Sequence, residues 1–231
     1  MRHAQGPLLT IDLTERTAST TRIDDRLASF VGGRGLNTSL AYDRIPFDAD
    51  PLGGENRLIF TSGPMQTSTM SFTGRMNCTA VSPLTDGLLS SNAGGFMSRH
   101  FADTGYGAIE LAGAADELTI VHVRDDGVEF EAVPDLAGAT VPETVDYIEA
   151  EHGIESDQTA VIGPAGENGV RYASIMTTEE RAFGRGGLGA VMGSKNVKAI
   201  TVGGDSRPEI DIPATQMEIH REAATEDHIM K

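Results

Sequence analysis

The sequence predicts an α+β fold built from a duplicated unit of strands and short helices. Its apolar runs are short and end at glycine or proline, double glycines precede segments of helical length, and the same order of features occurs twice. The chain has 231 residues, of which 39% are hydrophobic, so it can form one large domain or two small ones around a sizeable core. Because aromatic residues make up only 5%, that core must consist mainly of Ile, Leu, Val, Met and Ala.

The first elements follow from the residue pattern near the N-terminus. Residues 8–13 (LLTIDL) predict a strand, and a threonine-rich turn and a second extended piece come next. Gly32-Gly33 then precedes residues 36–45, a segment of helical length.

A longer pattern follows twice: a strand that ends in Gly-Pro, a second strand, a double glycine, a helix and a closing strand. Two copies indicate a duplicated α+β unit. Chance is the competing explanation, because the chain has 27 glycines. The first copy comprises 58–62 with Gly63-Pro64, 77–81, Gly94-Gly95, 96–105 and 108–111; the second comprises 159–162 with Gly163-Pro164, 171–176, Gly186-Gly187, 188–197 and 199–202.

Other elements lie between and after the copies. Residues 118–123 and 128–133 flank Asp125-Asp126-Gly127 and predict a hairpin between the copies, followed by a helix over 142–152. After Gly203-Gly204, residues 205–213 carry two prolines and several charges, which is typical of a linker. Residues 214–231 favour a helix that ends without a cap, so we place a domain boundary near residue 207.

The charge balance excludes several partners. There are 34 acidic and 18 basic residues, a net charge of −16, and only three of the basic residues are lysine. An acidic surface repels nucleic acid and anionic membranes, so we expect neither as a partner. The same composition suits a halophilic protein in a salt-rich cytoplasm, and the alternative is an ordinary acidic domain.

The single cysteine, Cys78, excludes an internal disulfide and a self-contained iron–sulfur cluster, which needs about four thiolates. We expect Cys78 to be a small core residue in a strand. No run approaches the roughly 18 apolar residues of a membrane span, and the first ten residues do not resemble a signal peptide, so we expect a cytoplasmic protein.

The glycine-rich segment 181–196 (RAFGRGGLGAVMGSKN) is the most informative motif. Gly184, Gly186 and Gly189 spell G-x-G-x-x-G, but a polar turn precedes them instead of a strand, which argues against a dinucleotide fold, and the order Gly-Ser-Lys does not match a P-loop. A glycine turn still lets backbone N–H groups approach an anion, and Arg181 and Arg185 could bind phosphate oxygens. The competing interpretation is a tight packing turn with solvated arginines.

The first copy has matching parts. Arg75 follows Gly74, and Asn92 precedes Gly94-Gly95. Asn92 could offer its carbonyl oxygen to magnesium or cap the next helix, and the cap alone is the commoner role. Arg34, in Gly32-Gly33-Arg34-Gly35, makes a third cationic glycine turn, or is simply an exposed arginine.

The remaining titratable residues give weaker signals. We interpret the acidic and histidine residues of 218–228 as a solvated helix face, and His100 and His122, which lack a partner at a recognisable spacing, as structural residues. The sequence predicts no catalytic residue, because no Ser-His-Asp or Cys-His arrangement occurs.

Several blocks together resemble the tungsten-containing aldehyde:ferredoxin oxidoreductase family, in the family's order and spacing over about residues 8–204. Val81 and Gly107 depart from the family pattern, where lysine and aspartate are usual. The matching blocks are 32–36 (GGRGL), 50–52 (DPL) with 55–56 (EN), 62–64 (SGP), 82–85 (SPLT), 92–95 (NAGG), 162–168 (IGPAGEN) and 181–200.

The resemblance implies a single N-terminal domain, residues 1–207, of two similar halves with two mixed β-sheets and short helices, serving as the platform for a tungsten (or molybdenum) bis-pterin. Residues 208–231 would then be a linker and the truncated start of a following helical domain. The resemblance assigns pterin and phosphate contacts to Arg75, Asn92, Gly94, Gly95, Arg181, Ala182, Gly184, Arg185, Gly186 and Gly187, and a phosphate-bridging magnesium to Asn92 and the carbonyl of Ala182.

The implied activity is oxidation of an aldehyde to a carboxylic acid with ferredoxin as electron acceptor. The implied partners are ferredoxin, the chain's own C-terminal domains and the aldehyde, and a homodimer is compatible. The [4Fe-4S] cluster would belong to downstream domains, so we expect this chain alone to be inactive. Two alternatives stay open: a free-standing, non-catalytic pterin-binding module, and the platform of a relative that reduces an aromatic thioester.

Overall fold

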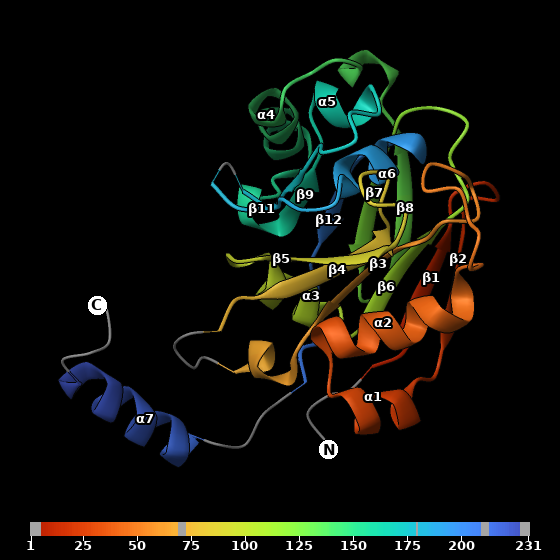
Figure 1. Ribbon diagram of the computed structural model, residues 1–231. Coiled ribbons are helices and arrows are strands. Elements are labelled where there is room, and N and C mark those ends of the chain that lie inside the picture. The colour runs from red at the N-terminus through yellow and green to blue at the C-terminus, as the bar shows by residue number, and fades with distance from the viewer. Residues whose placement is uncertain (1–5, 69–72, 179, 209–212, 227–231) are drawn as a thin grey trace.

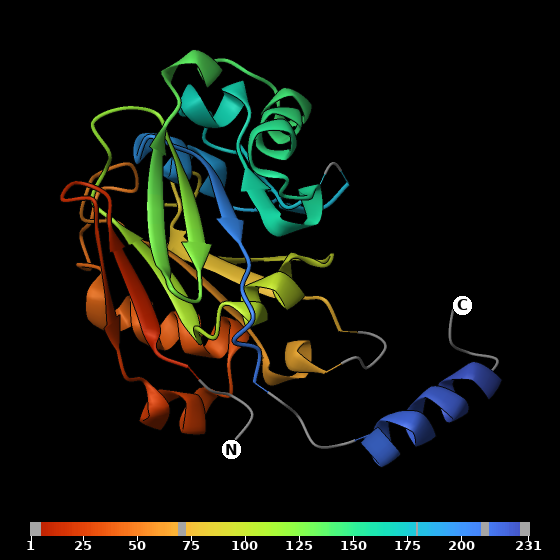
Figure 2. The ribbon, with the colours of Figure 1, turned by 180° about the vertical axis from the view of Figure 1, so that it is seen from behind.

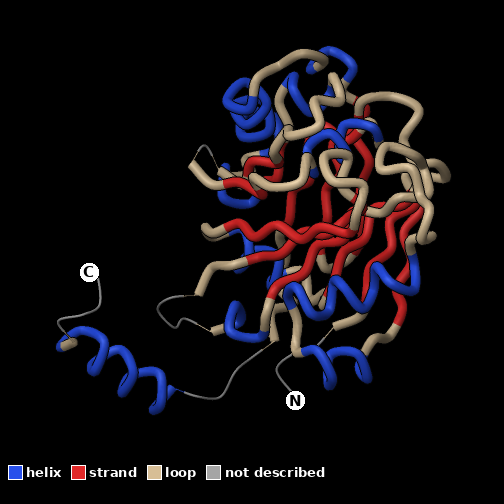
Figure 3. The backbone as a smooth tube through the Cα atoms, in the orientation of Figure 1, coloured by secondary structure: helices blue, strands red, loops and turns tan. Residues whose placement is uncertain are grey.

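The computed structural model describes residues 6–68, 73–178, 180–208 and 213–226. These residues form two mixed β-sheets of six strands each, with helices around and between them (Figures 1 and 3), which confirms the predicted α+β fold. Among the described helices, none combines the length and the apolar character needed to cross a bilayer.

The first sheet has the order β2-β1-β6-β3-β4-β5. Strands β1 and β6 are parallel, and the other neighbours are antiparallel. Its strands are β1 (Leu8–Asp12), β2 (Thr17–Thr21), β3 (Leu58–Ser62), β4 (Met76–Val81), β5 (Leu88–Ala93) and β6 (Ala108–Ala112).

The second sheet has the order β11-β10-β9-β12-β7-β8, again with a single parallel pair, β12 and β7. Its strands are β7 (Thr119–Arg124), β8 (Gly127–Ala132), β9 (Thr159–Val161), β10 (Ile175–Met176), β11 (Ala182–Phe183) and β12 (Val197–Val202).

The two sheets have the same topology, which supports the predicted duplication and enlarges it. Reversing the second order gives β8-β7-β12-β9-β10-β11, which matches the first sheet strand by strand. The β7–β8 hairpin was predicted between the copies, and this placement is wrong: the hairpin is the counterpart of β1–β2 and opens the second copy. The repeat therefore covers almost all of residues 8–202.

The helices complete the symmetry, because equivalent helices occupy equivalent layers. Helix α2 packs on the outer face of the first sheet and α4 on that of the second, whereas α3 and α6 lie between the sheets (Figures 1 and 2). The helices are α1 (Asp24–Phe30), α2 (Gly33–Arg44), α3 (Met97–Asp103), α4 (Val141–His152), α5 (Pro164–Glu167), α6 (Leu188–Ser194) and α7 (Pro213–Thr225).

The main core lies between the sheets and is aliphatic, as the composition predicts. Phe60 and Phe183 are its edge-to-face aromatic pair, at 5.7 Å between ring centroids. Cys78 is fully buried in β4, and burial raises the pKa of its thiol, which confirms it as a core residue.

Two local predictions were incomplete. Of the strand predicted over 171–176, only Ile175–Met176 is a strand. Helix α1 was not predicted, since its seven residues contain a single buried side chain, Leu27, and give no helical periodicity. Helix α7 forms in the predicted helix-favouring stretch and lies apart from the two sheets (Figures 1 and 2).

Lys195 and its neighbour Asn196 join the two halves. The Lys195 ammonium is buried and donates to the carbonyl oxygens of Asn56 (2.5 Å) and Gly113 (3.0 Å). The Lys195 carbonyl accepts from Ala115 N–H (3.0 Å), and the Asn196 amide donates to the Ala115 carbonyl (2.6 Å). The Gly-Ser-Lys-Asn sequence is therefore a structural clamp on the segment that connects the sheets.

This clamp predicts an alkaline change in stability. Burial lowers the pKa of Lys195 from 10.5 to about 8. Between these values the unfolded chain holds a proton that the folded chain has lost, so the free energy of unfolding rises with pH across this window. Relative to Lys195→Met, we expect the wild-type chain to gain about 2–3 kcal/mol from pH 8 to pH 10.5. Urea unfolding of both proteins at several pH values measures the difference, and a constant difference would contradict it.

Candidate functional site

The equivalent edge strands β5 and β11 bring the predicted site residues together. The Arg185 N–H donates to the Ser91 hydroxyl (3.2 Å), and the Thr177 hydroxyl donates to the Gly94 carbonyl (3.4 Å). A Cβ built on Gly95 would lie 3.5 Å from Cγ of Arg181. The two glycine turns singled out in the sequence, 92–95 and 181–187, therefore lie against each other.

Gly186 and Gly187 serve as a buried packing turn. Both have left-handed backbones, with φ of 75° and 69°. A Cβ on Gly186 would lie 2.3 Å from the Leu89 side chain, and one on Gly187 would lie 2.0 Å from the Arg171 carbonyl oxygen. The Ser82 hydroxyl donates to the Gly186 carbonyl (2.7 Å). This part of the motif fits the packing interpretation, and direct contact of Gly186 and Gly187 with a cofactor stays a prediction.

The N-terminus of α6 is used in the same packing. The Gly189 N–H donates to the Ala173 carbonyl (2.9 Å), and residues 188–193 are all buried. Helices α3 and α6 have only seven residues each. Arginine side chains and exposed backbone, more than helix dipoles, must therefore supply any positive potential at this site.

Arg75 is exposed at the start of β4, on a turn held by Gln66. The Gln66 side-chain oxygen accepts from the Gly74 N–H (2.7 Å) and from the Ser98 hydroxyl (3.0 Å). Gly74 has φ of 99°, and a Cβ there would lie 2.9 Å from the Gly95 carbonyl oxygen. The turns at Gly74 and at Gly94-Gly95 are thus fixed to one another. Sequence reasoning missed the role of Gln66, because Gly63-Pro64 marks a turn there but does not show which backbone groups the Gln66 side chain contacts.

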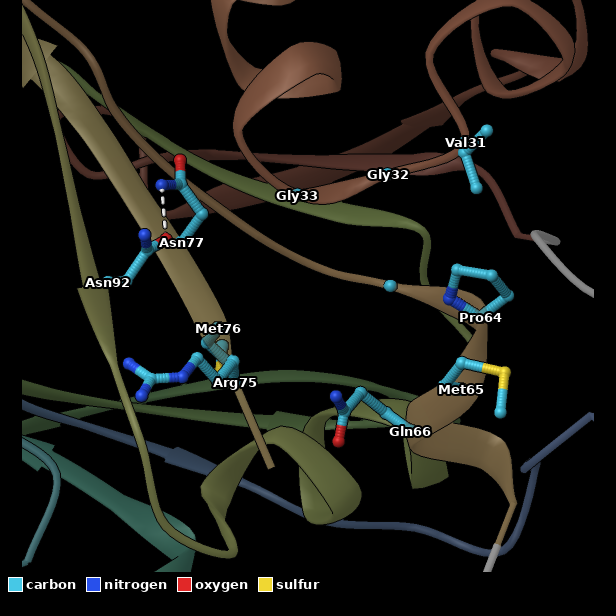
Figure 4. A pocket seen from close by; sticks show the side chains of 11 residues that line it. Val31, Gly32, Gly33, Pro64, Met65, Gln66, Arg75, Met76, Asn77 and Asn92 are labelled. Atoms are coloured by element: carbon cyan, nitrogen blue, oxygen red, sulfur yellow. Dashed lines mark hydrogen bonds between the residues drawn. The ribbon is translucent and has the colours of Figure 1, made fainter. Parts of the chain in front are cut away.

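Asn92 lies in β5 and ends a chain of amide side chains that leads out from the core. The Asn37 amide nitrogen donates to the Asn77 side-chain oxygen (2.8 Å). The Asn77 amide nitrogen in turn donates to the Asn92 side-chain oxygen (2.8 Å; Figure 4). The alternative that Asn92 caps the next helix is wrong: Phe96 occupies the N-cap of α3 and no side chain caps it. The Asn92 oxygen keeps a second lone pair for a ligand.

Two pockets flank the 74–75 turn. One, of about 320 Å³, contains Arg75, Asn77 and Asn92 together with the 31–33 and 63–66 turns, and Figure 4 shows these side chains around it. The other, of about 580 Å³, contains Gly74, Gly95, Arg99 and Arg181. Gly32 and Gly33 line the first pocket, so the third glycine turn joins the site, with Arg34 exposed beside it.

The arginines of this site are available to a ligand. Within the described residues, Arg75, Arg181 and Arg185 form no ion pair, and all three are exposed. Arg99, which sequence reasoning missed, has a buried Nε without a hydrogen-bond partner in the described structure, and its guanidinium lies over the Phe96 ring. The position of Arg99, four residues after Gly95, was the sequence signal that could have identified it. Unpartnered guanidinium groups around glycine backbone fit an anionic ligand, with Glu180 as an opposing charge at the rim.

Ala182 and Gly184 lie at the same edge. Ala182 pairs with Met176 in the β10–β11 hairpin and is half-buried, whereas Gly184 is exposed. Among the described residues, this edge offers backbone and cations, and the absence of a catalytic residue from this chain stays a prediction.

Comparison with known proteins assigns the family. Residues 8–204 match the model for the aldehyde ferredoxin oxidoreductase N-terminal domain. The chain belongs to the aldehyde ferredoxin oxidoreductase family. It is 37% identical to the tungsten-containing aldehyde ferredoxin oxidoreductase of Pyrococcus abyssi over 94% of this chain, and 38% identical to that of Pyrococcus furiosus over 86%.

A solved structure shares the fold. The active site complex BamBC of benzoyl coenzyme A reductase, in complex with 1,5-dienoyl-CoA, superposes with a TM-score of 0.90 over 97% of this chain at 33% identity. The chain spans 36% and 33% of the two Pyrococcus enzymes and 34% of the BamBC chain. It therefore corresponds to the N-terminal domain of this oxidoreductase family.

The packing turn predicts a large penalty for Gly187→Ala. Gly153 is a matched control, because its φ of 66° is close to that of Gly187 and a Cβ there would meet nothing within 4 Å. We expect Gly153→Ala to cost about 1 kcal/mol from backbone strain, and Gly187→Ala about 3 kcal/mol or more because the Arg171 backbone must also move. Denaturant unfolding of both variants measures this, and equal costs would show that the contact adds nothing.

Proposed function

We propose that this chain is the cofactor-platform domain of an enzyme that oxidises aldehydes to carboxylic acids, and that it holds a tungsten (or molybdenum) bis-pterin at the β5–β11 edge. The observation that carries the proposal is the group of unpaired arginines, Arg75, Arg181 and Arg185, around the glycine backbone of 92–95 and 184. A phosphate-bearing pterin is an anion that such groups recognise, and the tungsten in the names of the Pyrococcus relatives supports the metal.

Each part of the edge has a separate role in this proposal. The arginines bind phosphate oxygens, and Gly94, Gly95 and Gly184 let the ligand approach the backbone. Asn92 and the Ala182 carbonyl hold a magnesium ion that bridges the phosphates, since hard cations prefer oxygen ligands. Gly186 and Gly187 are the remaining proposed cofactor contacts, through their backbone at the base of the site.

The bound group supplies the redox chemistry, and the domain supplies orientation and charge. Residues 1–207 form this domain in our proposal, and residues 208–231 are a linker and the start of the next domain. In this proposal ferredoxin is the electron acceptor and the protein is cytoplasmic. A [4Fe-4S] cluster would be held by downstream domains, because the only cysteine of this chain, Cys78, is buried in β4.

A second candidate is the platform of an enzyme that reduces an aromatic thioester. The observation that favours it is the TM-score of 0.90 to the BamBC complex of benzoyl coenzyme A reductase. We favour aldehyde oxidation, because identity is higher to the Pyrococcus enzymes, at 37–38%, than to the BamBC chain, at 33%. Assay of the full-length protein with an aldehyde and oxidised ferredoxin, and with an aromatic coenzyme A thioester and a reductant, distinguishes the two.

The arginines give a direct test of cofactor binding. In the full-length protein, we expect Arg75→Ala with Arg181→Ala to lower the tungsten and pterin content at least about tenfold, since each charge-assisted contact contributes about 1.5–3 kcal/mol. Tungsten is measured by mass spectrometry and pterin by fluorescence after release.

Arg22→Ala is the matched control, because Arg22 is an exposed arginine whose partner is Asp24 on the surface. It should keep the full cofactor content, and circular dichroism should show all variants folded. Full cofactor in the double variant would refute the site.

We also propose that the protein works in high salt. The described lysines, Lys195 and Lys198, are both buried, so the described surface carries carboxylates with arginine as their main counter-charge. We expect the melting temperature to rise with KCl, because screening relieves repulsion, and to rise less in Glu149→Gln with Glu151→Gln. A melting temperature that is unchanged or falls with KCl would contradict this.

A further inference from the structure

Away from the β5–β11 edge, one histidine-containing cluster has the composition and spacing of a transition-metal site. His122, Glu131 and His152 each place one potential ligand atom within 4.8 Å of the others. Among the described residues, this is the one group of three or more His, Cys, Asp or Glu side chains that meets this spacing. The sequence offers no partner for His122 at a recognisable spacing; in the structure its partners lie 9 and 30 positions later, on a hairpin strand and at a helix end.

Three elements of the second half build the cluster. His122 projects from β7 and Glu131 from the neighbouring strand β8, while His152 is the last residue of α4. Helix α4 begins with a capping box at Thr140 and Glu143 and ends at Gly153 in the left-handed conformation. Both ends of the helix are therefore fixed, and its C-terminus, which favours cations, lies at the cluster.

The interatomic distances are close to those of a metal's ligand shell. Nε2 of His122 lies 3.1 Å and Nε2 of His152 lies 3.0 Å from the same Glu131 oxygen. Zinc bonds to nitrogen and oxygen at about 2.0–2.2 Å, so neighbouring ligands of a tetrahedral ion lie about 3.3 Å apart. The ligand nitrogens of the two imidazoles lie within 4.8 Å of each other, so an ion that binds all three side chains would draw the imidazoles together around the Glu131 carboxylate.

The surrounding hydrogen bonds are of the kind that orient metal ligands. His122 Nδ1 lies 2.9 Å from the Thr201 hydroxyl, which can accept its proton and leave Nε2 with a lone pair. The Tyr147 hydroxyl donates to the other Glu131 oxygen (2.6 Å), which leaves the first oxygen for an ion.

The cluster is accessible and distinct from the proposed cofactor site. It opens into a pocket of about 340 Å³ that shares no lining residue with the pockets at the 74–75 turn. Asp126 and Glu129 at this pocket attract cations, with Arg124 as the opposing charge. The His152 side chain is 32% exposed, which leaves a fourth coordination position open to water.

We propose that His122, Glu131 and His152 bind a first-row transition-metal dication such as Zn²⁺, independently of the pterin site. Two imidazoles and one carboxylate are a ligand set typical of zinc, whereas magnesium and calcium prefer oxygen ligands alone. The open fourth position is typical of a site that exchanges a ligand.

The test uses the full chain without an affinity tag, in high salt with excess Mg²⁺ to occupy exposed carboxylates. We expect Zn²⁺ to compete with a chromophoric chelator for one site, and Co²⁺ to give the visible absorption of a low-symmetry nitrogen-containing site. His152→Gln and Glu131→Gln should each weaken Zn²⁺ affinity at least about tenfold. Their side chains are 32% and 23% exposed, so both variants should fold, and circular dichroism checks this.

His100→Gln is the matched control. His100 on α3 lies 3.6 Å from Asp103 of the same helix and 3.3 Å from Asp157 in the turn 156–158, but among the described residues it belongs to no such three-residue group. It should bind Zn²⁺ like the wild type. The proposal is overturned if the wild-type chain does not bind Zn²⁺ under these conditions, if both cluster variants bind it unchanged, or if His100→Gln loses as much affinity. Since the cofactor content of the arginine variants is a separate readout, failure here leaves the proposed function unaffected.

Discussion

The close packing of the Gly186-Gly187 turn against the first sheet is the constraint on which the candidate site depends. Because these glycines have no Cβ, the Leu89 side chain and the Arg171 carbonyl oxygen pack directly against their backbone, where a Cβ would clash. The Ser82 hydroxyl donates to the Gly186 carbonyl and fixes the turn. That contact sets the position of β11 beside β5. Because Arg181 and Arg185 flank β11 while Asn92, Gly94 and Gly95 lie at the end of β5, the same contact decides whether the cations surround the glycine backbone. The buried Lys195 clamp supports it from the other side of α6, where it ties Asn56 and Gly113 to the end of that helix.

The duplication explains why two different polar centres occupy matching places. In the first half, the Thr10 hydroxyl donates to Glu110 across the parallel pair β1–β6, and the buried carboxylate is neutralised by Arg44 and Arg57. In the second half, the corresponding strands β7 and β12 carry His122 and Thr201, also hydrogen-bonded, and the charged partner is Glu131. A buried charge in a sheet is tolerated only when it is paired. One half meets this requirement with an internal ion pair, whereas the other pairs Glu131 with two imidazoles that line an open pocket.

Much of the fold could be predicted because strands, turns and repeats leave local signals. The hairpin at Asp125-Asp126-Gly127 followed from its turn residues, and the helix predicted over 142–152 followed from helical spacing and a proline in the first turn. The repeated Gly-Pro and Gly-Gly order revealed most of the duplication. Arg75, Arg181, Arg185 and Asn92 were predicted from the same glycine turns, whereas Arg99 was missed. Gln66, Asn77 and the His122 cluster could not be predicted, because their roles depend on contacts between residues distant in sequence. The glycines illustrate the limit: the sequence could not separate Gly94 and Gly184, which are accessible, from Gly186 and Gly187, which are buried, since only packing distinguishes them.

The electrostatic design follows from the same structure. With a net charge of −16, the average surface repels a phosphate-bearing ligand, and in concentrated salt the Debye length falls to about 3 Å at 1 M. Long-range attraction from a few arginines would be screened under those conditions, so recognition must come from direct contact. Guanidinium groups that lack carboxylate partners, held over backbone that glycine keeps accessible, satisfy this requirement, because forked hydrogen bonds at contact distance are screened far less than remote charges. The two lysines within the described residues, in contrast, lie where salt does not reach: Lys195 and Lys198 are buried and donate to carbonyl groups of the scaffold. Arginine serves both places in this chain. Arg44 and Arg57 neutralise the buried Glu110, whereas Arg75, Arg181 and Arg185 form no ion pair among the described residues and lie where we propose that the ligand binds.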